Sequence, residues 1–494
     1  MQLSESKKVI VIGAGVGGLA TAIRLSVKGY EVEVFESNSY VGGKLSQINS
    51  KGFRFDAGPS LFTMPELVDE LFCLAGKNPR EHFNYLKLDE SCRYFYTDGT
   101  FLKGYSDPDK FAEEAAQKTG VNSDDVGRHL EKSAYIYDST AFLFLERSLH
   151  KFKSYLSLKV VKSFLKLPFL GIFSSMDTAN KKAMNNKKME QLFNRYATYN
   201  GSNPFLAPSI LNIIPHLEFN KGAFFPTQGM YSIATSLYHL AQSLGVKFHL
   251  NSRVTKINVE DKHTTGVEIG DLKVNADFVV CNLDVYFVYH NLLKEQKKPV
   301  RTLRQERSTS ALIFYWGIDK RFKNLDLHNI FFADHYKAEF DALREGKAIH
   351  HDPTVYVNIT SKKNKNDAPE GCENWFVMIN VPSNNGQDWD SLIVEARQYV
   401  LQKLSKQLET NLESHILTEE ILEPRTIESK TASFQGSLYG TASNNKMAAF
   451  FRHSNFSNHI EGLYFCGGSV HPGGGIPLAL SSAKIVGGFF QTLN

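Results

Sequence analysis

The sequence predicts an α/β fold with α+β character, in which the two ends of the chain meet in one domain built on a parallel sheet. Two glycine-rich segments predict it, residues 9–36 and residues 463–484, which lie more than 400 residues apart. A third observation is the length of 494 residues, which is enough for about three domains and a large core. We therefore expect a composite protein whose first domain is assembled from discontinuous segments.

The first element is a strand, a tight turn and a helix in direct succession. A β-branched apolar run ends at residue 12, and a helical pattern covers residues 19–28. The turn between them contains Gly13, Gly15, Gly17 and Gly18. The first of these glycines permits the turn, the second lets the backbone approach a pyrophosphate, and the last lets the helix pack closely on the strand. The N-terminus of the helix presents free N–H groups to the anion, so the pattern predicts a dinucleotide site.

The second element is a parallel strand over residues 29–36, which ends in an acid. Glu36 follows Gly18 by eighteen residues and can bind ribose hydroxyls. A lone glycine turn is often purely structural, but the strand, the helix and the acid together make that explanation weaker. An acid here favours a free ribose over a 2′-phosphate, so FAD or NAD fits better than NADP. The residues by themselves do not separate FAD from NAD.

Composition narrows the functional class. A net charge of +4 on so long a chain argues against a dedicated nucleic-acid binder. The five cysteines are an odd number without a Cys-x-x-Cys pair, which is typical of isolated thiols in a reducing compartment, so we expect no disulfide framework and no metal. Phenylalanine is frequent, with 36 residues. Most of these belong in an aromatic core, and some are candidates to line a cavity for a long apolar ligand.

One basic, apolar segment raises the question of membrane contact. Residues 147–176 contain no acid and interleave lysines with phenylalanines and leucines. This pattern is typical of an interfacial amphipathic helix pair, here broken at Pro168, although a solvated basic face on an ordinary core helix explains it equally well. No run reaches the roughly 18 apolar residues that span a bilayer, and no signal-peptide pattern precedes the first strand. We expect a cytoplasmic protein bound peripherally to the inner face of the membrane.

The remaining elements divide the chain into three parts. Residues 1–89, 223–299 and 455–494 form the nucleotide-binding domain, with short strands between residues 253 and 282 as a small antiparallel excursion. Residues 90–222 are the helical, membrane-associating part of a substrate domain. Residues 300–454 form its substrate-binding sheet, because strand patterns at 310–318, 354–359 and 375–381 accompany a helical pattern at 391–408.

With these elements in order, the chain resembles the bacterial-type carotenoid desaturases, the phytoene desaturase group of FAD-dependent amine-oxidase-like flavoproteins. The resemblance covers nearly the whole length. Its motifs lie at residues 9–36, 41–44, 55–59, 195–204, 225–230 and 462–477. The last is the most specific, because it combines a strand, a glycine-rich turn and a helix start.

The resemblance implies a Rossmann-type FAD-binding domain with non-covalent FAD, beside a substrate domain with a mixed sheet. Glu36 would hold the ribose, Val254 would give backbone contacts to adenine, and the turn with Gly43 and Lys44 would lie near the pyrophosphate. The isoalloxazine would lie beside Asp56, Gly58 and Pro59 and against the C-terminal turn formed by Gly467, Gly468, His471, Pro472, Gly475 and Ile476. Backbone N–H groups at the start of the last helix would favour negative charge on the reduced ring.

The resemblance also implies a reaction. A second dinucleotide motif is missing from the sequence, so we expect FAD to take hydride from a long acyclic carotenoid and to pass electrons to oxygen or a quinone. Candidate proton acceptors are Glu146, Arg147 and His453, although each is more easily explained as structural. Residues 467–471 and 476–480 depart from the usual phytoene desaturase pattern. They are similar to the later-acting 1-hydroxycarotenoid 3,4-desaturases.

Several alternatives stay open at this point. Phytoene desaturases, carotenoid isomerases, saturases and terminal oxidases share these motifs. A non-enzymatic prenyl- or lipid-binding module and an amine oxidase share the fold, because function resides in the site and not in the scaffold. The mass of the product distinguishes the carotenoid enzymes from one another. The presence of bound FAD distinguishes these enzymes from the non-enzymatic lipid-binding module.

Overall fold

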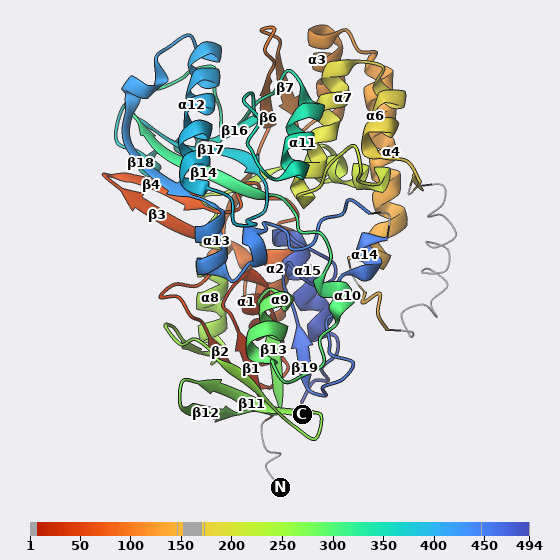
Figure 1. Cartoon of the computed structure of the whole chain (residues 1–494), viewed down its shortest axis with the longest axis vertical. Helices are drawn as coiled ribbons and strands as arrows, with labels where there is room; N and C mark the ends of the chain where they lie inside the picture. The colour runs from red at the N-terminus through yellow and green to blue at the C-terminus, as the bar shows by residue number, and fades with distance from the viewer. Residues whose placement is uncertain (1–6, 146, 152–169, 172, 446, 494) are drawn as a thin grey trace.

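The computed structural model describes residues 7–145, 147–151, 170–171, 173–445 and 447–493. Figure 1 shows two stacked parts. The lower part holds the first strands of the chain and its last helix, and the upper part holds a large sheet and a group of helices. Segments far apart in the sequence therefore build the same layer, as the glycine-rich ends predict.

The lower part is built on a five-stranded sheet in which every neighbouring pair is parallel. Its strands come from both ends and from the middle of the chain. In spatial order they are β19 (Leu463–Phe465), β13 (Phe278–Cys281), β1 (Lys8–Ile12), β2 (Glu31–Phe35) and β9 (Lys247–His249). The predicted parallel strands 7–12 and 29–36 are thus confirmed as β1 and β2.

Helices cover this sheet because its strands are apolar on both faces. Helix α1 packs against α15, α8 and α2. Their bounds are α1 (Val16–Val27), α2 (Glu66–Leu74), α8 (Ser232–Ser243) and α15 (Ile476–Gly487). A Cβ atom on Gly18 would lie 2.1 Å from the carbonyl oxygen of Gly13, so α1 can approach β1 only with glycine at that position.

Smaller sheets complete the lower part. The predicted antiparallel excursion is confirmed as a three-stranded sheet of β10 (Lys256–Glu260), β11 (His263–Ile269) and β12 (Leu272–Asn275). A hairpin of β3 (Ser46–Ser50) and β4 (Phe53–Ala57) leads toward the upper part. Strands β5 (Tyr85–Lys87) and β8 (Phe224–Pro226) pair with each other.

The upper part is built on a seven-stranded mixed sheet, antiparallel except where β15 runs parallel to β6. In spatial order its strands are β18 (Ile416–Leu422), β14 (Ser310–Ile318), β17 (Glu373–Val381), β16 (Val355–Asn358), β15 (His328–Phe331), β6 (Glu90–Phe95) and β7 (Phe101–Tyr105). Strands β6 and β7 lie within residues 90–222, which the sequence pattern assigned to helices. The turn between them has Gly99 at φ +85°, a hairpin signal that the pattern contained.

The two faces of the seven-stranded sheet have different neighbours. Helix α12 (Trp389–Gln407) covers the outer face, where Leu312, Phe314 and Trp316 form a buried core with it. The inner face points toward α4 (Ser123–Phe144) and the helices beside it (Figure 1). These helices are α3 (Pro108–Thr119), α6 (Met176–Met184), α7 (Lys187–Asn194), η4 (Arg195–Asn200), η5 (Ser209–Ile213) and η6 (His216–Asn220).

Short helices join these layers. The short α-helices are α9 (Val285–Phe287), α10 (Val300–Leu303), α11 (Tyr336–Glu345), α13 (Pro424–Thr431) and α14 (Ala448–Phe451). Single 3-10 or π turns are η1 (Pro79–Glu81), η7 (Val288–Leu292), η8 (Thr360–Lys362), η9 (Lys365–Asp367), η10 (Leu412–His415) and η11 (Phe434–Gly436). Of the predicted amphipathic pair at 147–176, residues 152–169 and 172 lie outside the described residues.

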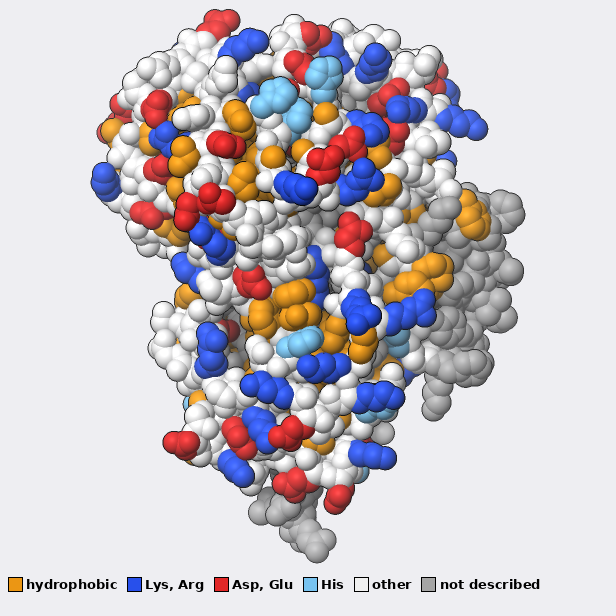
Figure 2. Space-filling view, viewed as in Figure 1, with side chains coloured by type: hydrophobic (Ala, Val, Ile, Leu, Met, Phe, Trp, Pro, Cys, Tyr) orange, Lys and Arg blue, Asp and Glu red, His pale blue; other side chains and the backbone are white. Residues whose placement is uncertain are grey.

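Two surface properties bear on function. Within the described residues, no helix is both long and apolar enough to cross a bilayer. On the face shown in Figure 2, acidic and basic side chains are interspersed, without a broad area of one sign. That distribution agrees with the small net charge and does not form the basic stripe of a nucleic-acid site.

Candidate active site

One large cavity connects the two parts of the molecule. Its volume is about 1670 Å³, and it runs from the glycine turn after β1 to the inner face of the seven-stranded sheet. Sites for a single small ligand are usually about 300–1,000 Å³, so this cavity has room for more than one. Phe173 and Met447 line it and are 66% and 47% exposed.

The lower end of the cavity is formed by the turn between β1 and α1 and by the end of β2. Gly13, Gly15 and Gly17 line it, and Gly13 has φ +95°, a conformation that favours glycine. Glu36 is buried and lines the same end. One of its carboxylate oxygens accepts the Ala14 N–H at 2.8 Å, which holds the acid beside the turn. Val254 also lines this end.

A loop after β2 packs directly on the glycine turn. A Cβ atom on Gly43 would lie 3.3 Å from the Cα of Gly15, so the two backbones are in close contact. The adjacent Lys44 donates its Nζ–H groups to the carbonyls of Ser437 and Leu438, both at 2.8 Å. Burial lowers the pKa of Lys44 to about 8. Both Gly43 and Lys44 line the cavity, and the lysine places a positive charge there.

The C-terminal turn closes the same end from the opposite side. Gly467, Gly468, His471, Pro472, Gly475 and Ile476 all line the cavity. A Cβ atom on Gly17 would lie 3.2 Å from the backbone nitrogen of Gly467, so the first and last glycine turns touch. The predicted meeting of the two chain ends is confirmed by this contact. His471 donates from Nε2 to the Arg147 carbonyl at 2.8 Å, and burial lowers its pKa to about 3, so the ring is neutral.

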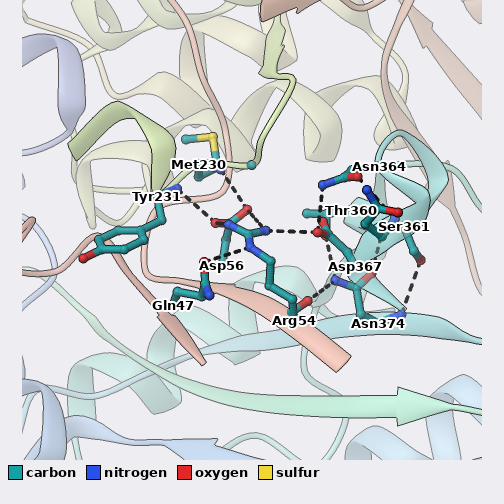
Figure 3. Close-up of polar contacts among 12 residues, drawn as sticks. Gln47, Arg54, Asp56, Met230, Tyr231, Thr360, Ser361, Asn364, Asp367 and Asn374 are labelled. Carbon is teal, nitrogen blue, oxygen red and sulfur yellow. Dashed lines mark hydrogen bonds and ion pairs between the residues drawn. The ribbon is translucent and has the colours of Figure 1, made fainter. Parts of the chain in front are cut away.

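Asp56, Gly58 and Pro59 differ in whether they line the cavity. Gly58 and Pro59 line the cavity as expected, but the Asp56 carboxylate points elsewhere. It accepts the N–H groups of Met230 at 2.8 Å and Tyr231 at 2.9 Å, just before α8, and pairs with Arg54 at 2.7 Å (Figure 3). Alternation along β4 explains the difference: Ala57 lines the cavity, so the preceding side chain points to the opposite face.

Arg54 extends this contact into a buried network. Its guanidinium also pairs with Asp367 at 3.3 Å, and the Asp367 carboxylate accepts from Thr360 and Asn364 (Figure 3). Burial raises the pKa of Asp367 despite the arginine. Asp56 and Arg54 thus fasten β4 to α8 and to the loop before β17, and they do not line the cofactor end.

Arg452 is a cavity residue that sequence reasoning missed. Its side chain is 3% exposed, and Nη2 donates to the Thr441 carbonyl at 2.9 Å. Nη1 is buried without a hydrogen-bond partner among the described residues. Burial, and then Arg307, lower the pKa of Arg452 to about 10, so it stays charged at neutral pH. A Cβ atom on Gly473 would lie 3.1 Å from its Cζ, which places this cation at the C-terminal turn.

Neither of the two candidate proton acceptors that the structure describes lines the cavity. Glu146 lies outside the described residues. The Arg147 guanidinium stacks over the Phe142 ring, with Cζ 4.6 Å from the ring centroid. His453 uses both ring nitrogens, with Nδ1 2.7 Å from the Ser454 carbonyl and Nε2 3.1 Å from the Tyr289 hydroxyl. Neither Arg147 nor His453 is among the residues that line the cavity.

The upper end of the cavity is largely apolar. Ile313, Met378, Tyr356 and Ile330 are successive cross-strand neighbours on β14, β17, β16 and β15, and all four line it. Opposite this row, α4 contributes Thr140, Ala141 and Phe144, and η5 contributes Ile210, Leu211 and Ile213. The two walls enclose a channel suited to a long apolar ligand.

Comparison with known proteins identifies the class that this geometry defines. The chain belongs to the family of flavin-containing amine oxidoreductases, whose pattern matches residues 16–486. The buried arginine with a free N–H, the two touching glycine turns and Glu36 fit an FAD molecule at the lower end. The protein is a flavin-dependent oxidoreductase.

Several similar proteins have names that state an activity on carotenoids. A 1-hydroxycarotenoid 3,4-desaturase from Flavobacterium sp. (strain P99-3) is 51% identical over 99% of this chain and 100% of its own length. A 4,4′-diapolycopene oxygenase from Methylomonas sp. is 32% identical, over 98% of each chain. A phytoene desaturase from Phycomyces blakesleeanus is 31% identical, over 98% of this chain and 85% of its own.

Solved structures share the fold at low identity. An oxidoreductase from Methanosarcina mazei has a TM-score of 0.64 and 17% identity, covering 96% of this chain and 98% of its own. Putrescine oxidase with bound putrescine has a TM-score of 0.62 and 12% identity, covering 98% of each chain. These likenesses define the two-part architecture and say nothing of the substrate.

Proposed function

We propose that this enzyme is an FAD-dependent carotenoid desaturase that introduces a C=C bond into a long acyclic polyene, at the 3,4 bond of a 1-hydroxycarotenoid. One observation carries the proposal: the cofactor end and a long apolar channel form one continuous cavity. A relative that is 51% identical over its full length bears that activity in its name. Non-covalently bound FAD would supply the acceptor for the hydride that leaves the substrate, and a proton would leave the neighbouring carbon.

The residues of the chain bind, orient and exclude water. Glu36, Val254 and the first glycine turn would hold the adenosine end of FAD, Gly43 and Lys44 would lie near its pyrophosphate, and the second turn would hold its ring; all of them line the cavity. The row from Ile313 to Ile330 and the helix α4 hold the polyene by apolar contact along its length. Because the channel walls are apolar, water is kept from the reacting carbons, and orientation supplies much of the rate.

The lower end also sets the charge near the ring. Arg452 is a buried cation at the C-terminal turn, and the start of α15 presents backbone N–H groups there. Both favour a ring that has gained negative charge. The glycine turn after β1 supplies a site for one dinucleotide, which the FAD would occupy. In this proposal the electrons of the reduced FAD would therefore pass to oxygen or a quinone and not to a bound nicotinamide.

We further propose the three-part organisation with boundaries at residues 1–89, 223–299 and 455–494, at 90–222, and at 300–454. The enzyme works in the cytoplasm and binds the inner face of the membrane peripherally through the basic segment 147–176. The chemistry of the substrate supports this, because a long carotenoid resides in the bilayer. The exposed Phe173, which lines the cavity and lies within this segment, would give the substrate a direct route.

The test is a desaturation assay with FAD-loaded protein in liposomes. Phytoene and an acyclic 1-hydroxycarotenoid are supplied separately, and products are analysed by mass and absorbance. The proposal requires loss of two hydrogens and a red shift from the hydroxycarotenoid alone. Conversion of phytoene would make the enzyme a phytoene desaturase, and unchanged masses would indicate an isomerase or a lipid carrier.

A second candidate is oxidation of a terminal methyl group. Its support is the 32% identity to a diapolycopene oxygenase over nearly the whole chain. The same assay distinguishes methyl oxidation from desaturation, because methyl oxidation adds oxygen to the product. Loss of two hydrogens without added oxygen rejects the second candidate.

A further inference from the structure

A group of buried polar side chains interrupts the apolar upper end of the cavity. Arg195, Tyr199, Glu218 and His328 all line the cavity, although they come from η4, η6 and β15. Glu218 is 1% exposed and His328 is 4% exposed. Buried polar atoms normally have partners, so each atom here that has none needs an explanation.

The first branch of this group leaves a free hydrogen-bond acceptor. Arg195 donates from Nη1 to the Tyr199 oxygen at 2.9 Å, so the tyrosine hydroxyl gives its hydrogen to Oε2 of Glu218, at 2.8 Å. Oε1 of Glu218 lies 3.9 Å from Nη2 of Arg195, which is too far for a hydrogen bond. Among the described residues Oε1 has no hydrogen-bond partner, and it can only accept.

The second branch leaves a free donor. The Nδ2 of Asn358 lies 3.1 Å from Nδ1 of His328. An amide nitrogen can only donate, so Nδ1 is the acceptor and the ring carries its hydrogen on Nε2. Burial lowers the pKa of His328 to about 3, which keeps the ring neutral. Nε2 is buried and has no hydrogen-bond partner among the described residues.

The charge of Arg195 acts on both branches, and the second branch leads toward the cofactor end. Arg195 pairs with Glu218, and its charge also lowers the pKa of His328. The Tyr356 hydroxyl lies 2.7 Å from Nδ1 of His328 and 2.8 Å from the Ser60 hydroxyl. Ser60 follows Gly58 and Pro59, which line the cavity at the lower end, so this chain of contacts reaches the expected position of the flavin.

We propose that this polar group binds the hydroxyl of the substrate, with Nε2 of His328 donating to the hydroxyl oxygen and Oε1 of Glu218 accepting its hydrogen. A hydroxyl both donates and accepts, whereas a carbonyl only accepts and a hydrocarbon does neither. The inference rests on the proposed function and names its specificity residues. In a 1-hydroxycarotenoid a single carbon separates the hydroxyl-bearing carbon from the 3,4 bond, so the hydroxyl must bind near the flavin.

The experiment compares two carotenoids that differ only in the hydroxyl at C1. For each, kcat/KM is measured with wild type, His328→Phe, Glu218→Gln and the matched control Met378→Leu. Met378 lines the same face of the sheet but is apolar. In Glu218→Gln the side-chain oxygen stays with the Tyr199 hydroxyl, so a donor replaces the acceptor. FAD content and circular dichroism identify any variant that fails to fold. If either His328→Phe or Glu218→Gln does not fold, the measurements on the other of these two variants are used.

The kcat/KM of wild type should be about 30-fold higher for the hydroxylated carotenoid than for the hydrocarbon, because a substrate without the hydroxyl leaves buried polar groups unpaired. His328→Phe and Glu218→Gln should each lower kcat/KM for the hydroxylated carotenoid by about tenfold and leave the hydrocarbon within about twofold. Met378→Leu should leave the preference unchanged. The inference is overturned if wild type has no preference, or if both variants lower the two values by the same factor.

A binding measurement separates this inference from the proposed reaction. The dissociation constants of the dehydrogenated hydroxycarotenoid and of its hydrocarbon counterpart are measured by quenching of protein fluorescence, since a product is not turned over. If wild type converts neither carotenoid, the proposed reaction fails. The proposed hydroxyl site is then supported if the hydroxylated product binds at least about tenfold more tightly than the hydrocarbon product and His328→Phe removes this difference. It is rejected if the two products bind to wild type with equal affinity.

Discussion

Replacing Asp56 by asparagine tests whether this residue is structural, as its contacts indicate. Both carboxylate oxygens face donors: Oδ1 receives Arg54 Nη2 and the Tyr231 N–H, and Oδ2 receives the Met230 N–H and Arg54 Nη1. In Asp56→Asn the amide nitrogen must therefore face donors at one of the two positions. The substitution keeps the size of the side chain but leaves the half-buried Arg54 with one carboxylate partner, the fully buried Asp367.

The expected loss of stability follows from this geometry. Removing one partner of a buried ion pair costs about 3–5 kcal/mol, and the loss should lie near 3 kcal/mol because Asp367 still pairs with Arg54. The matched control is Asp341→Asn, in the exposed pair of Lys337 and Asp341, where the cost should be below about 0.5 kcal/mol. Holoenzyme is unfolded in urea, with circular dichroism and flavin fluorescence recorded together. Equal losses for Asp56→Asn and Asp341→Asn would refute the reasoning.

Two further predictions concern the cofactor and pH. Glu36→Ala should raise the dissociation constant of FAD about 10- to 100-fold, measured by titrating apoprotein, because a charged acceptor is removed beside the turn. Glu31→Gln, at a partly exposed residue of β2, should leave this constant unchanged. An unchanged value for Glu36→Ala would contradict the role of Glu36 in binding the ribose. Burial lowers the pKa of His129 to about 4, against about 6.5 when unfolded, so the unfolded state binds more protons as the pH falls below 6.5. Stability contributed by the neutral ring is therefore complete above pH 6.5 and decreases by about 1.4 kcal/mol per pH unit down to pH 4. His129→Phe should make the decrease in urea midpoint between pH 6 and pH 5 smaller, and an identical decrease in both proteins would show that this ring does not titrate as described.

Much of the lower part could be predicted because its signals are local. The β-branched run before Gly13 and the glycine turn itself specify strand, turn and helix within about 20 residues. The antiparallel excursion after Val254 has equally clear short strands. The strand that contains Asp56 was predicted, but the contacts of its carboxylate were not, because motif similarity does not say to which face of a strand a side chain points. Side chains alternate along β4, so Ala57 lines the cavity while Asp56 points to the other face.

The polar part of the upper cavity could not be predicted in the same way. Arg195 and Glu218 are near in sequence, but His328 joins them only through the packing of η4 and η6 on the seven-stranded sheet. Arg452 lies at the C-terminal turn through contacts with Thr441 and Gly473 that no periodic pattern encodes. Non-local contacts of this kind follow from the fold, so they are found only after the sheet order is known.

The proposed desaturation is decided by the mass of the product that FAD-loaded protein in liposomes forms from an acyclic 1-hydroxycarotenoid. The product should be two hydrogens lighter than the substrate, with an absorbance maximum at longer wavelength. A product that has gained oxygen, or a carotenoid recovered at its original mass from protein that retains FAD, would contradict the proposed desaturation.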